Sequence, residues 1–197
     1  SNISSLVPVA KGDVYAPLLQ GKVLGNLFFE NSTRTRMSFE SAMKRLGGEV
    51  VNLSSVGSSV AKGETLYDTM QMVDGYSDIA VIRHPRQGAA QYSADAIGIP
   101  VLNAGDGAGN HPTQTMLDLF TIRESHGTID RLNVVLVGDL RYGRTTHSLS
   151  HALVRFGAKL TLVSPDSLRM PDEIVSDLKS HGSEVVETED IAGSIAE

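Results

Sequence analysis

The chain has 197 residues, of which 41% are hydrophobic and 20% charged, a composition typical of a globular protein with one large domain or two small ones. The absence of cysteine excludes a disulfide framework, thiolate metal ligands and a cysteine nucleophile, and the net charge of −6 with only 5% aromatic residues argues against a broad nucleic-acid surface. No long apolar run predicts a membrane span and no signal-peptide pattern is visible, so we expect a cytoplasmic protein that has neither nucleic acid nor membrane as a partner.

The first predicted strand leads into the most polar turn of the chain. Residues 1–20 lack a clear apolar period and predict a partly ordered lead-in. The apolar run 23–29 predicts a buried strand, and apolar spacing over 35–46 predicts a helix. Between them, residues 32–36 read Ser-Thr-Arg-Thr-Arg, which is more charge and more hydroxyl than a helix cap needs. Because a helix N-terminus attracts anions, this turn predicts a phosphate or carboxylate site.

Strands and helices alternate along the rest of the chain. The segment 54–63 is small, polar and glycine-containing, and predicts a mobile loop. The alternation predicts an α/β fold with two parallel-sheet domains that meet near residues 127–131. Further strands are predicted at 49–53, 78–82, 100–103, 133–137, 158–163 and 184–187, and further helices start at 64 and 112 or span 87–97, 147–156 and 171–181.

Four predicted strand-to-helix turns carry reactive side chains, and in a parallel sheet they can converge on one edge. Arginine suits bidentate recognition of carboxylate or phosphate, and a neutral imidazole at a helix start can donate to a carbonyl oxygen. We find no carboxylate pair, Ser-His-Asp arrangement or metal cluster in the sequence. These groups therefore suit stabilisation of an anionic transition state and positioning of two anionic reactants. The side chains are those of Ser32, Thr33, Arg34 and Thr35, of Arg83 and His84, of His111 and Gln114, and of Arg141 and Arg144.

Several of these groups have a structural interpretation as well. Taken alone, residues 83–85 are equally well explained as a strand end at the surface, and His84 is expected to be structural or solvent-facing. His147 and His151 have the spacing of metal ligands, but their apolar neighbours favour a structural role over zinc. The turn 138–143 lacks G-x-G-x-x-G and its aspartate would repel a pyrophosphate, so no nicotinamide site is expected. Orienting roles are predicted for Asp106 and Asp139, and core positions for Met37, Met43, Met70 and Met116.

From about Lys22 to its end, the sequence resembles the catalytic chains of the aspartate carbamoyltransferase family. Six motifs occur in the family's order and at similar spacing. The Ser-Thr-Arg-Thr stretch is shared with ornithine carbamoyltransferase, whereas the Lys-Gly-Glu-Thr and Tyr-Gly-Arg-Thr motifs resemble the aspartate enzyme. The motifs are Phe-Phe-Glu-x-Ser-Thr-Arg-Thr-Arg at residues 28–36, Lys-Gly-Glu-Thr at 62–65, Arg-His-Pro at 83–85, Asn-Ala-Gly-Asp-Gly at 103–107, His-Pro-Thr-Gln at 111–114 and Gly-Asp-Leu-x-Tyr-Gly-Arg-Thr at 138–145.

The resemblance implies a role for each matching residue. Ser32, Thr33, Arg34 and Thr35 would bind the phosphate of carbamoyl phosphate. Thr35, Arg83 and His111 would contact the carbamoyl oxygen and stabilise the tetrahedral oxyanion. Gln114 would hold the carbamoyl amino group and Arg144 a carboxylate of L-aspartate. Ser58, with Ser59 as the alternative, and Lys62 would lie on a loop that reaches the active site of a neighbouring subunit. The residues expected to be catalytic are Arg34, Thr35, Lys62, Arg83 and His111.

The resemblance also implies an assembly and a pair of domains. Residues 1–130 would form a complete carbamoyl-phosphate-binding domain and residues 131–197 part of an L-aspartate-binding domain. The family forms homotrimers with shared active sites, to which a regulatory chain or fused pathway domains can attach, and it needs no metal or organic cofactor at the catalytic site. Family chains continue past this one, so we expect a fragment with little or no turnover of its own. Two alternatives are a carbamoyltransferase for another amine, such as ornithine, and a non-catalytic carbamoyl-phosphate-binding module or paralogue.

Overall fold

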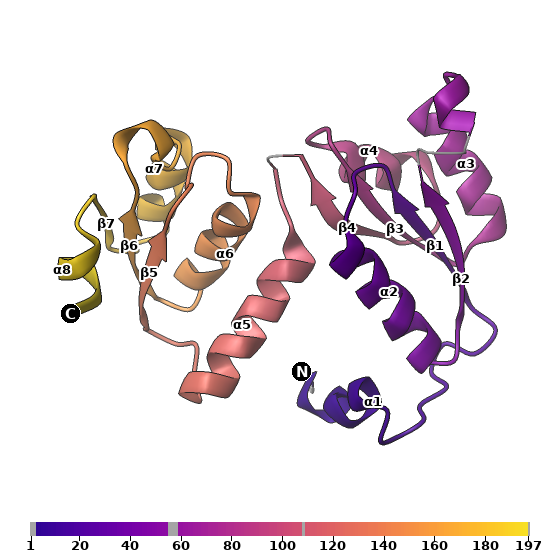
Figure 1. The fold of residues 1–197 in the computed structure, drawn as a ribbon, viewed down its shortest axis with the longest axis horizontal. Helices are drawn as coiled ribbons and strands as arrows, with labels where there is room; N and C mark the ends of the chain where they lie inside the picture. Colours follow the sequence, from indigo (N-terminus) through magenta and orange to yellow (C-terminus); the bar gives the residue numbers. More distant parts are fainter. Residues whose placement is uncertain (1–2, 55–58, 108, 197) are drawn as a thin grey trace. The chain divides into compact units, whose positions relative to one another are not determined.

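The computed structural model describes residues 3–54, 59–107 and 109–196. The chain forms two compact units, residues 1–106 and 107–197. Each unit has its own parallel β-sheet with helices packed against it (Figure 1). The predicted α/β class with two parallel sheets is therefore confirmed.

The sheet of the first unit has the strand order β2-β1-β3-β4, with all neighbouring pairs parallel. Its strands are β1 (Val23–Phe28), β2 (Glu49–Ser54), β3 (Ile79–His84) and β4 (Val101–Asp106), and its helices are η1 (Ile3–Leu6), α1 (Val7–Lys11), α2 (Thr33–Arg45), η2 (Ser59–Lys62), α3 (Leu66–Tyr76) and α4 (Ala89–Ala96).

Strand β1 is covered on both faces, which explains its nearly continuous apolar sequence. Leu24 and Phe28 pack with Met43 of α2, whereas Leu27 packs with Met70 of α3 and Ala90 of α4. Right-handed crossovers explain why the helices lie on opposite faces of the sheet. From β1 the chain moves to one neighbouring position for β2, and it then moves in the opposite direction along the sheet to β3 and β4. The two helix layers hold β1 and β3 rigidly, so the polar groups at their carboxyl ends have fixed positions.

The second unit has the strand order β5-β6-β7, also parallel. In its core, Leu160 and Leu162 of the central strand pack with Leu153 and Leu178 of two helices. The elements are α5 (Pro112–His126), β5 (Asn133–Val137), α6 (Arg144–Val154), β6 (Lys159–Val163), η3 (Asp166–Leu168), α7 (Asp172–Ser180), β7 (Val185–Thr188) and α8 (Ile191–Ala196).

One expectation about local structure is wrong, that two of the methionines lie in the core. The lead-in contains η1 and α1, which is consistent with a partly ordered segment, and α1 is held by a hydrogen bond from Arg45 Nη1 to the carbonyl of Val9 (3.4 Å). Its five residues are too few to show a helical period in the sequence. Met37 and Met116 are 60% and 63% exposed, whereas Met43 and Met70 are buried as predicted. Met37 lies about 240° around the helix from Met43, and Met116 lies one turn before the residues of α5 that join the second core.

The boundary between the two compact units differs from the predicted boundary between the two domains. Contacts divide the chain between Asp106 and Gly107, which places α5 with the second unit. The predicted boundary near residue 130 concerns ligand-binding domains and stays a prediction. Among the described residues, no helix has both the length and the apolar character needed to cross a membrane.

Candidate active site

The turn between β1 and α2 presents backbone donors and hydroxyls at the carboxyl edge of the first sheet. Ser32 is the N-cap of α2 with extended backbone, and its side chain makes no capping hydrogen bond among the described residues. The first N–H groups of a helix have no intrahelical acceptor and lie at the positive end of the helix dipole. Ser32 and Thr35 are half-buried, while Thr33 and Arg34 are exposed. The turn can therefore receive an anion, as the sequence predicts.

Arg83 lies beside this turn, at the end of the neighbouring strand. Its Cα pairs with that of Phe28, and its carbonyl accepts the N–H of Phe29 (2.9 Å). The side chain is buried, with Nη2 2.6 Å from Glu30 Oε1 and Nη1 3.4 Å from the carbonyl of Ala104. Within the described part of the chain, Arg83 Nε has no hydrogen-bond partner. A buried guanidinium with a donor to spare is suited to an anionic or carbonyl ligand.

Glu30 holds Arg83, a role that is not evident from the sequence alone. Glu30 is the second residue after β1, so the ion pair joins the segments that follow or end β1 and β3. The signal in the sequence is one acidic residue in a strand-to-helix turn that is otherwise cationic. Its charge offsets part of that of Arg83 and fixes the rotamer of the long arginine side chain.

The residue after Arg83 has a structural role, as expected. The imidazole of His84 stands edge-on to Phe29, with ring centroids 5.4 Å apart, and its Nδ1 accepts the N–H of Arg86 (3.0 Å). Burial, followed by the positive charge of Arg86, lowers the pKa of His84 from its ordinary value. Asp106 orients the backbone as predicted, because its Oδ2 accepts the N–H of Gly88 (2.9 Å) at the start of α4.

The loop residues of the predicted site are described only in part. Ser58 lies outside the described residues. Ser59 and Lys62 are the two ends of η2, and no ion pair of Lys62 is found in the described ranges. No hydrogen bond or ion pair between these two residues and the turn at Ser32 is found among the described residues. A groove of about 800 Å³ separates η2 and α3 from the end of β3; it is lined by Val60, Glu64, Thr65, Tyr67, His84, Pro85, Arg86 and their neighbours.

In the second unit, Ser148 joins two predicted site residues. Its hydroxyl accepts the N–H of His111 (3.0 Å) and donates to the carbonyl of Arg144 (3.0 Å). His111 is buried and is the N-cap of α5, while Arg144 opens α6 and donates from Nη1 to the carbonyl of Gly107 (2.7 Å). Ser148 lies four residues after Arg144, one helical turn away, and this spacing is the signal in the sequence that points to it.

Within α5, the side-chain amide of Gln114 is oriented by a hydrogen bond to a neighbouring residue. Its amide nitrogen donates to Asp118 Oδ1 (2.9 Å), one helical turn further on. The amide oxygen is then the group that remains for a ligand, and an amide oxygen accepts hydrogen bonds from an amino group. This polarity agrees with the predicted contact to a carbamoyl amino group, which stays a prediction.

The turn after β5 is shaped by its aspartate, as expected. Asp139 Oδ1 accepts the N–H groups of Arg141 (3.1 Å) and Tyr142 (3.0 Å). The two histidines with metal-ligand spacing have different partners: His147 Nε2 lies 2.7 Å from the carbonyl of Leu140, and His151 Nδ1 lies 3.2 Å from Asp177 Oδ2. In the part of the chain that the structure describes, no three His, Cys, Asp or Glu residues could hold a metal ion.

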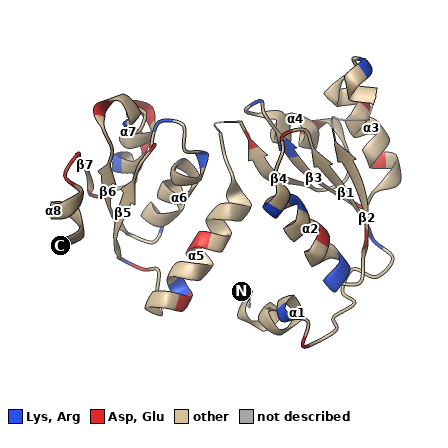
Figure 2. Cartoon of the chain, in the orientation of Figure 1, with Lys and Arg blue, Asp and Glu red and all other residues tan. Residues whose placement is uncertain are grey.

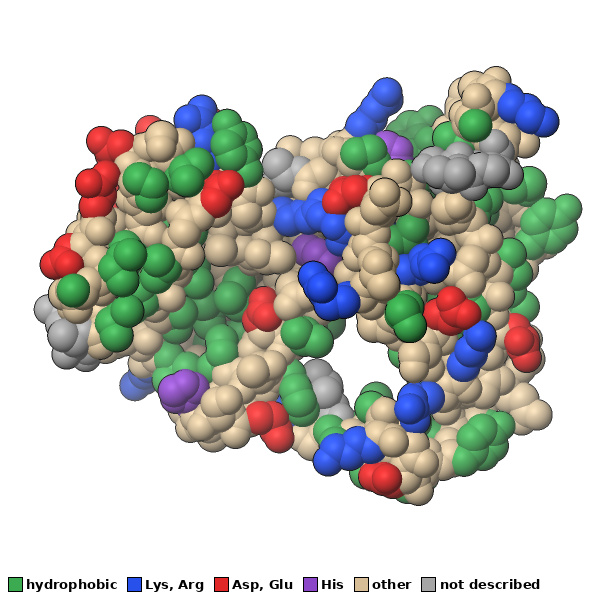
Figure 3. Space-filling model, in the orientation of Figure 1, with side chains coloured by type: hydrophobic (Ala, Val, Ile, Leu, Met, Phe, Trp, Pro, Cys, Tyr) green, Lys and Arg blue, Asp and Glu red, His purple; other side chains and the backbone are tan. Residues whose placement is uncertain are grey.

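The distribution of charge agrees with this division into two constellations. Figure 2 shows Lys and Arg at the start of α2 and near the ends of β3 and β5, and acidic residues around the ends of β6 and β7. The space-filling view shows arginine and lysine side chains in blue and histidine side chains in purple at the surface (Figure 3). Each unit thus carries its own cluster of polar groups for an anionic ligand.

Comparison with known proteins agrees with this chemistry. The family model described as "Aspartate/ornithine carbamoyltransferase, carbamoyl-P binding domain" matches residues 4–124. The chain is 57% identical over 192 residues to the aspartate carbamoyltransferase catalytic subunit of Methanococcoides burtonii, which covers 96% of this chain and 62% of that protein. The chain belongs to the aspartate/ornithine carbamoyltransferase family. It spans about 62% of the length of that relative.

Solved carbamoyltransferase structures share the fold. Aspartate transcarbamoylase from Trypanosoma cruzi, in complex with carbamoyl aspartate and phosphate, matches with a TM-score of 0.92 and 43% identity, covering 98% of this chain and 64% of that chain. The catalytic subunit of M. jannaschii aspartate transcarbamoylase matches with a TM-score of 0.86 and 44% identity, covering 98% of this chain and 67% of that chain.

Proposed function

We propose that this carbamoyltransferase chain transfers the carbamoyl group of carbamoyl phosphate to the amine of L-aspartate, giving N-carbamoyl-L-aspartate and phosphate for pyrimidine biosynthesis. One observation carries the proposal: the uncapped N-terminus of α2 and the buried Arg83 stand at the ends of adjacent strands of one sheet. Relatives with the same name in several organisms support aspartate as the acceptor.

Each residue is proposed to serve one part of the donor substrate. Ser32, Thr33, Arg34 and Thr35 bind the phosphate through hydroxyls, backbone N–H groups and one guanidinium. Arg83, whose Nε has no partner within the described residues, donates to the carbamoyl oxygen together with Thr35 and His111. Gln114 accepts from the carbamoyl amino group.

The chemistry proposed is addition followed by elimination. The aspartate amine attacks the carbamoyl carbon, the carbonyl oxygen becomes an oxyanion, and the carbon–oxygen bond to phosphate then breaks. Arg83 and His111 stabilise the oxyanion, and the cations around the leaving phosphate stabilise its charge. Arg144 binds an aspartate carboxylate, which positions the amine. This mechanism needs neither a metal nor an organic cofactor.

A homotrimer with shared active sites is proposed for the assembly, and the cytoplasm for its location. Lys62, with Ser58 or Ser59, would complete the active site of a neighbouring subunit. Support comes from the family resemblance of the Lys-Gly-Glu-Thr motif, whose lysine ends η2. Sedimentation should then give three times the mass of one chain. The attachment of a regulatory chain or of fused pathway domains stays a prediction of the family resemblance.

Calorimetric titration with carbamoyl phosphate, followed by L-aspartate or L-ornithine, tests the proposal. We expect carbamoyl phosphate to bind, and Arg83→Ala to weaken it by about tenfold or more, since a charge-assisted hydrogen bond is lost. The matched control is Arg86→Ala, whose side chain is exposed. Equal affinity in Arg83→Ala would contradict the assigned role, and preferential binding of L-ornithine would change the proposed acceptor.

A further inference from the structure

A buried asparagine stands in the middle of β1, on the face that α2 covers. Asn26 alternates with Leu24 and Phe28, which pack with Met43 of α2, so its side chain points to the same face. It is 0% exposed, and its Oδ1 has no hydrogen-bond partner among the described residues. A buried carbonyl oxygen without a donor lowers stability, and a leucine of similar size would avoid this loss. Asn26 therefore indicates a role other than stability.

The amide nitrogen of Asn26 connects two strands with α2. Its Nδ2 donates to Asn52 Oδ1 on β2 (2.8 Å) and to the carbonyl of Arg36 in α2 (3.4 Å). Asn52 is the register partner of Asn26, and its own Nδ2 donates to Glu40 Oε2 (3.1 Å). Arg36 and Glu40 are four residues apart along α2. The two strands thus hold the helix at two successive turns.

Glu40 is kept in the form that accepts these bonds. Its Oε1 pairs with Lys44 Nζ (2.9 Å), one turn further along α2. The hydrogen bonds from Lys44 and then from Asn52 lower the pKa of Glu40. The carboxylate is therefore charged near neutral pH, and the series of hydrogen bonds from β1 through β2 to α2 is continuous.

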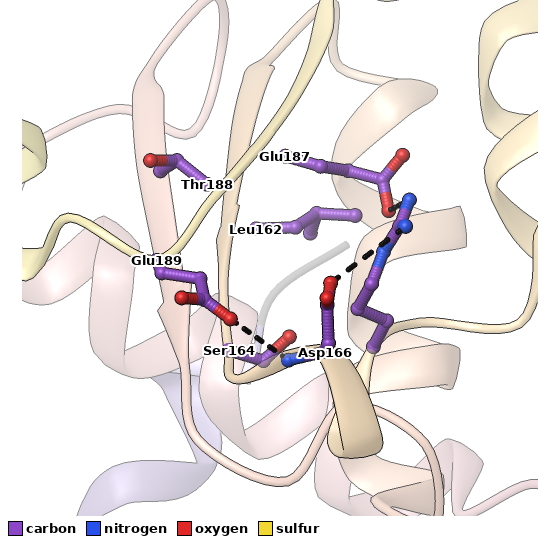
Figure 4. A pocket seen from close by; sticks show the side chains of 7 residues that line it. Leu162, Ser164, Asp166, Glu187, Thr188 and Glu189 are labelled. Atoms are coloured by element: carbon purple, nitrogen blue, oxygen red, sulfur yellow. Dashed lines mark hydrogen bonds and ion pairs between the residues drawn. The ribbon is translucent and has the colours of Figure 1, made fainter.

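The polar groups at the carboxyl ends of β6 and β7 provide a contrast (Figure 4). There, Arg169 Nη2 pairs with Glu187 Oε1 (3.0 Å), and Glu189 Oε1 accepts the N–H of Asp166 (3.0 Å). The side chain of Asp166 is 89% exposed, so water can satisfy what the protein leaves open. Asn26 has no such access to water, and its unpaired oxygen follows from placing the amide nitrogen where both of its bonds form.

We propose that Asn26 is a positioning residue for the anion site, because it fixes α2 on the sheet and thereby holds the N-terminus of the helix in place. The connection is short, since the N–H of Arg36 donates to the carbonyl of the N-cap, Ser32 (3.4 Å). Apolar packing is non-directional, whereas hydrogen bonds fix a helix along its axis. A binding site needs its donors held to within about 0.5 Å. This inference rests on the phosphate site proposed at the same turn.

NMR titration of the whole chain with inorganic phosphate, combined with urea unfolding, tests the proposal. Asn26→Leu removes both Nδ2 bonds together with the unpaired oxygen. We expect its phosphate affinity to fall about tenfold, while the midpoint of unfolding stays equal or rises. A purely structural role predicts the opposite, a lower midpoint and unchanged affinity. The control is Ser38→Ala, which removes the bond from Ser38 Oγ to the carbonyl of Thr35 (2.8 Å) within α2 and should keep the parent's affinity.

A reversal of donor and acceptor separates positioning from packing. Asn52→Asp keeps the acceptor for Asn26 but sets two carboxylates against each other, so phosphate affinity should fall. Adding Glu40→Gln restores the second bond in the opposite direction, and affinity should return to within about threefold of the parent's. The control combines Asn52→Asp with Glu49→Gln, at the start of β2. This pair restores the net charge but not the bond, so its affinity should stay low.

Two readouts separate this inference from the proposed function. If the parent chain binds no phosphate, the proposed function is contradicted, and amide spectra of the ligand-free chain decide the inference. In these spectra, Asn26→Leu should broaden the signals of residues 33–36 through exchange between positions of α2, and unbroadened signals would overturn the inference. If the parent chain binds phosphate, unchanged affinity in Asn26→Leu would overturn it. Equal affinities of the reversal pair and its charge-matched control would do the same.

Discussion

Burial gives Arg83 a different character from the exposed arginines of the chain. Its guanidinium is held between Glu30 and the carbonyl of Ala104, so the side chain is ordered before any ligand arrives. Arg34, in contrast, is exposed at the start of α2. A preordered donor loses little conformational entropy on binding, whereas the exposed arginine must be fixed. We therefore assign orientation of the ligand to Arg83 and attraction of its charge to Arg34.

His84 should make the stability of the first unit depend on pH. Burial and the charge of Arg86 lower its pKa in the folded state from the ordinary 6.5. The unfolded chain then binds a proton more readily, so the free energy of unfolding falls as the pH drops through 6.5. We expect the loss of stability between pH 7.5 and 5.5, measured by urea unfolding, to be smaller in His84→Gln.

The control for this prediction is His126→Gln, which changes an exposed histidine at the end of α5. Comparison of the two variants isolates the contribution of His84. A His84→Gln variant with the parent's full pH dependence would show that other groups cause it.

At the scale of elements, the helices α2 and α3 differ in the capping of their N-termini. Thr65 caps α3, because its hydroxyl oxygen accepts the N–H of Asp68 (3.1 Å), whereas the side chain of Ser32 caps nothing among the described residues of α2. Thr65→Ala should therefore cost about 1 kcal/mol of unfolding free energy, and Ser32→Ala much less. Chemical denaturation measures both. Ser32→Ala should instead weaken phosphate binding, and a loss of stability equal to that of Thr65→Ala would identify it as an ordinary cap.

The turn before α6 depends on a glycine for space. At Gly143 an added Cβ would collide with the backbone carbonyl of Asp139 and lie 2.9 Å from Thr146 Oγ1. The carbonyl belongs to the turn that carries Arg144, so it cannot yield without moving that arginine. We expect Gly143→Ala to lower the unfolding free energy by about 1–3 kcal/mol, as overpacking does.

The matched substitution is Gly75→Ala, in the last turn of α3, where nothing lies within 4 Å of an added Cβ. It should raise stability by up to about 1 kcal/mol, because alanine favours helix over glycine. Thermal unfolding of both variants measures the difference. Equal effects of the two substitutions would contradict the steric explanation for Gly143.

At the scale of the whole molecule, the sequence predicts the alternation of strands and helices. It does not predict the structural features that depend on tertiary contacts. Buried strands such as 23–28 and 79–84 show apolar runs because helices cover both of their faces. Helix α1 gives no such signal, since it has five residues and is held by Arg45 from far along the chain. The candidate site follows the same rule: its turns are visible as motifs, whereas Glu30 and Ser148 act through partners that only the fold brings near.

The two units have separate cores, and this allows a test of where an anion binds. The described hydrophobic clusters around β1 and around β6 share no residue. A ligand that binds a folded unit stabilises that unit by about 2.7 kcal/mol at one hundred times its dissociation constant. Inorganic phosphate, which lacks the carbamoyl and aspartate parts, should occupy only the turn at Ser32 and Arg34. Hydrogen exchange of the β1 and β3 amides should then slow by about one hundredfold, while exchange of the β6 amides stays unchanged.

Arg34→Ala provides the control for this last prediction, since it removes an exposed cation of the turn and leaves both cores intact. It should reduce the protection of the first unit at the same phosphate concentration. Equal slowing of β1 and β6 would mean that the two units open together or that both bind phosphate. Slowing confined to β6 would move the anion site to the second unit, where His111 and Arg144 are the candidate donors. The pattern of protection thus assigns the phosphate to one unit independently of turnover.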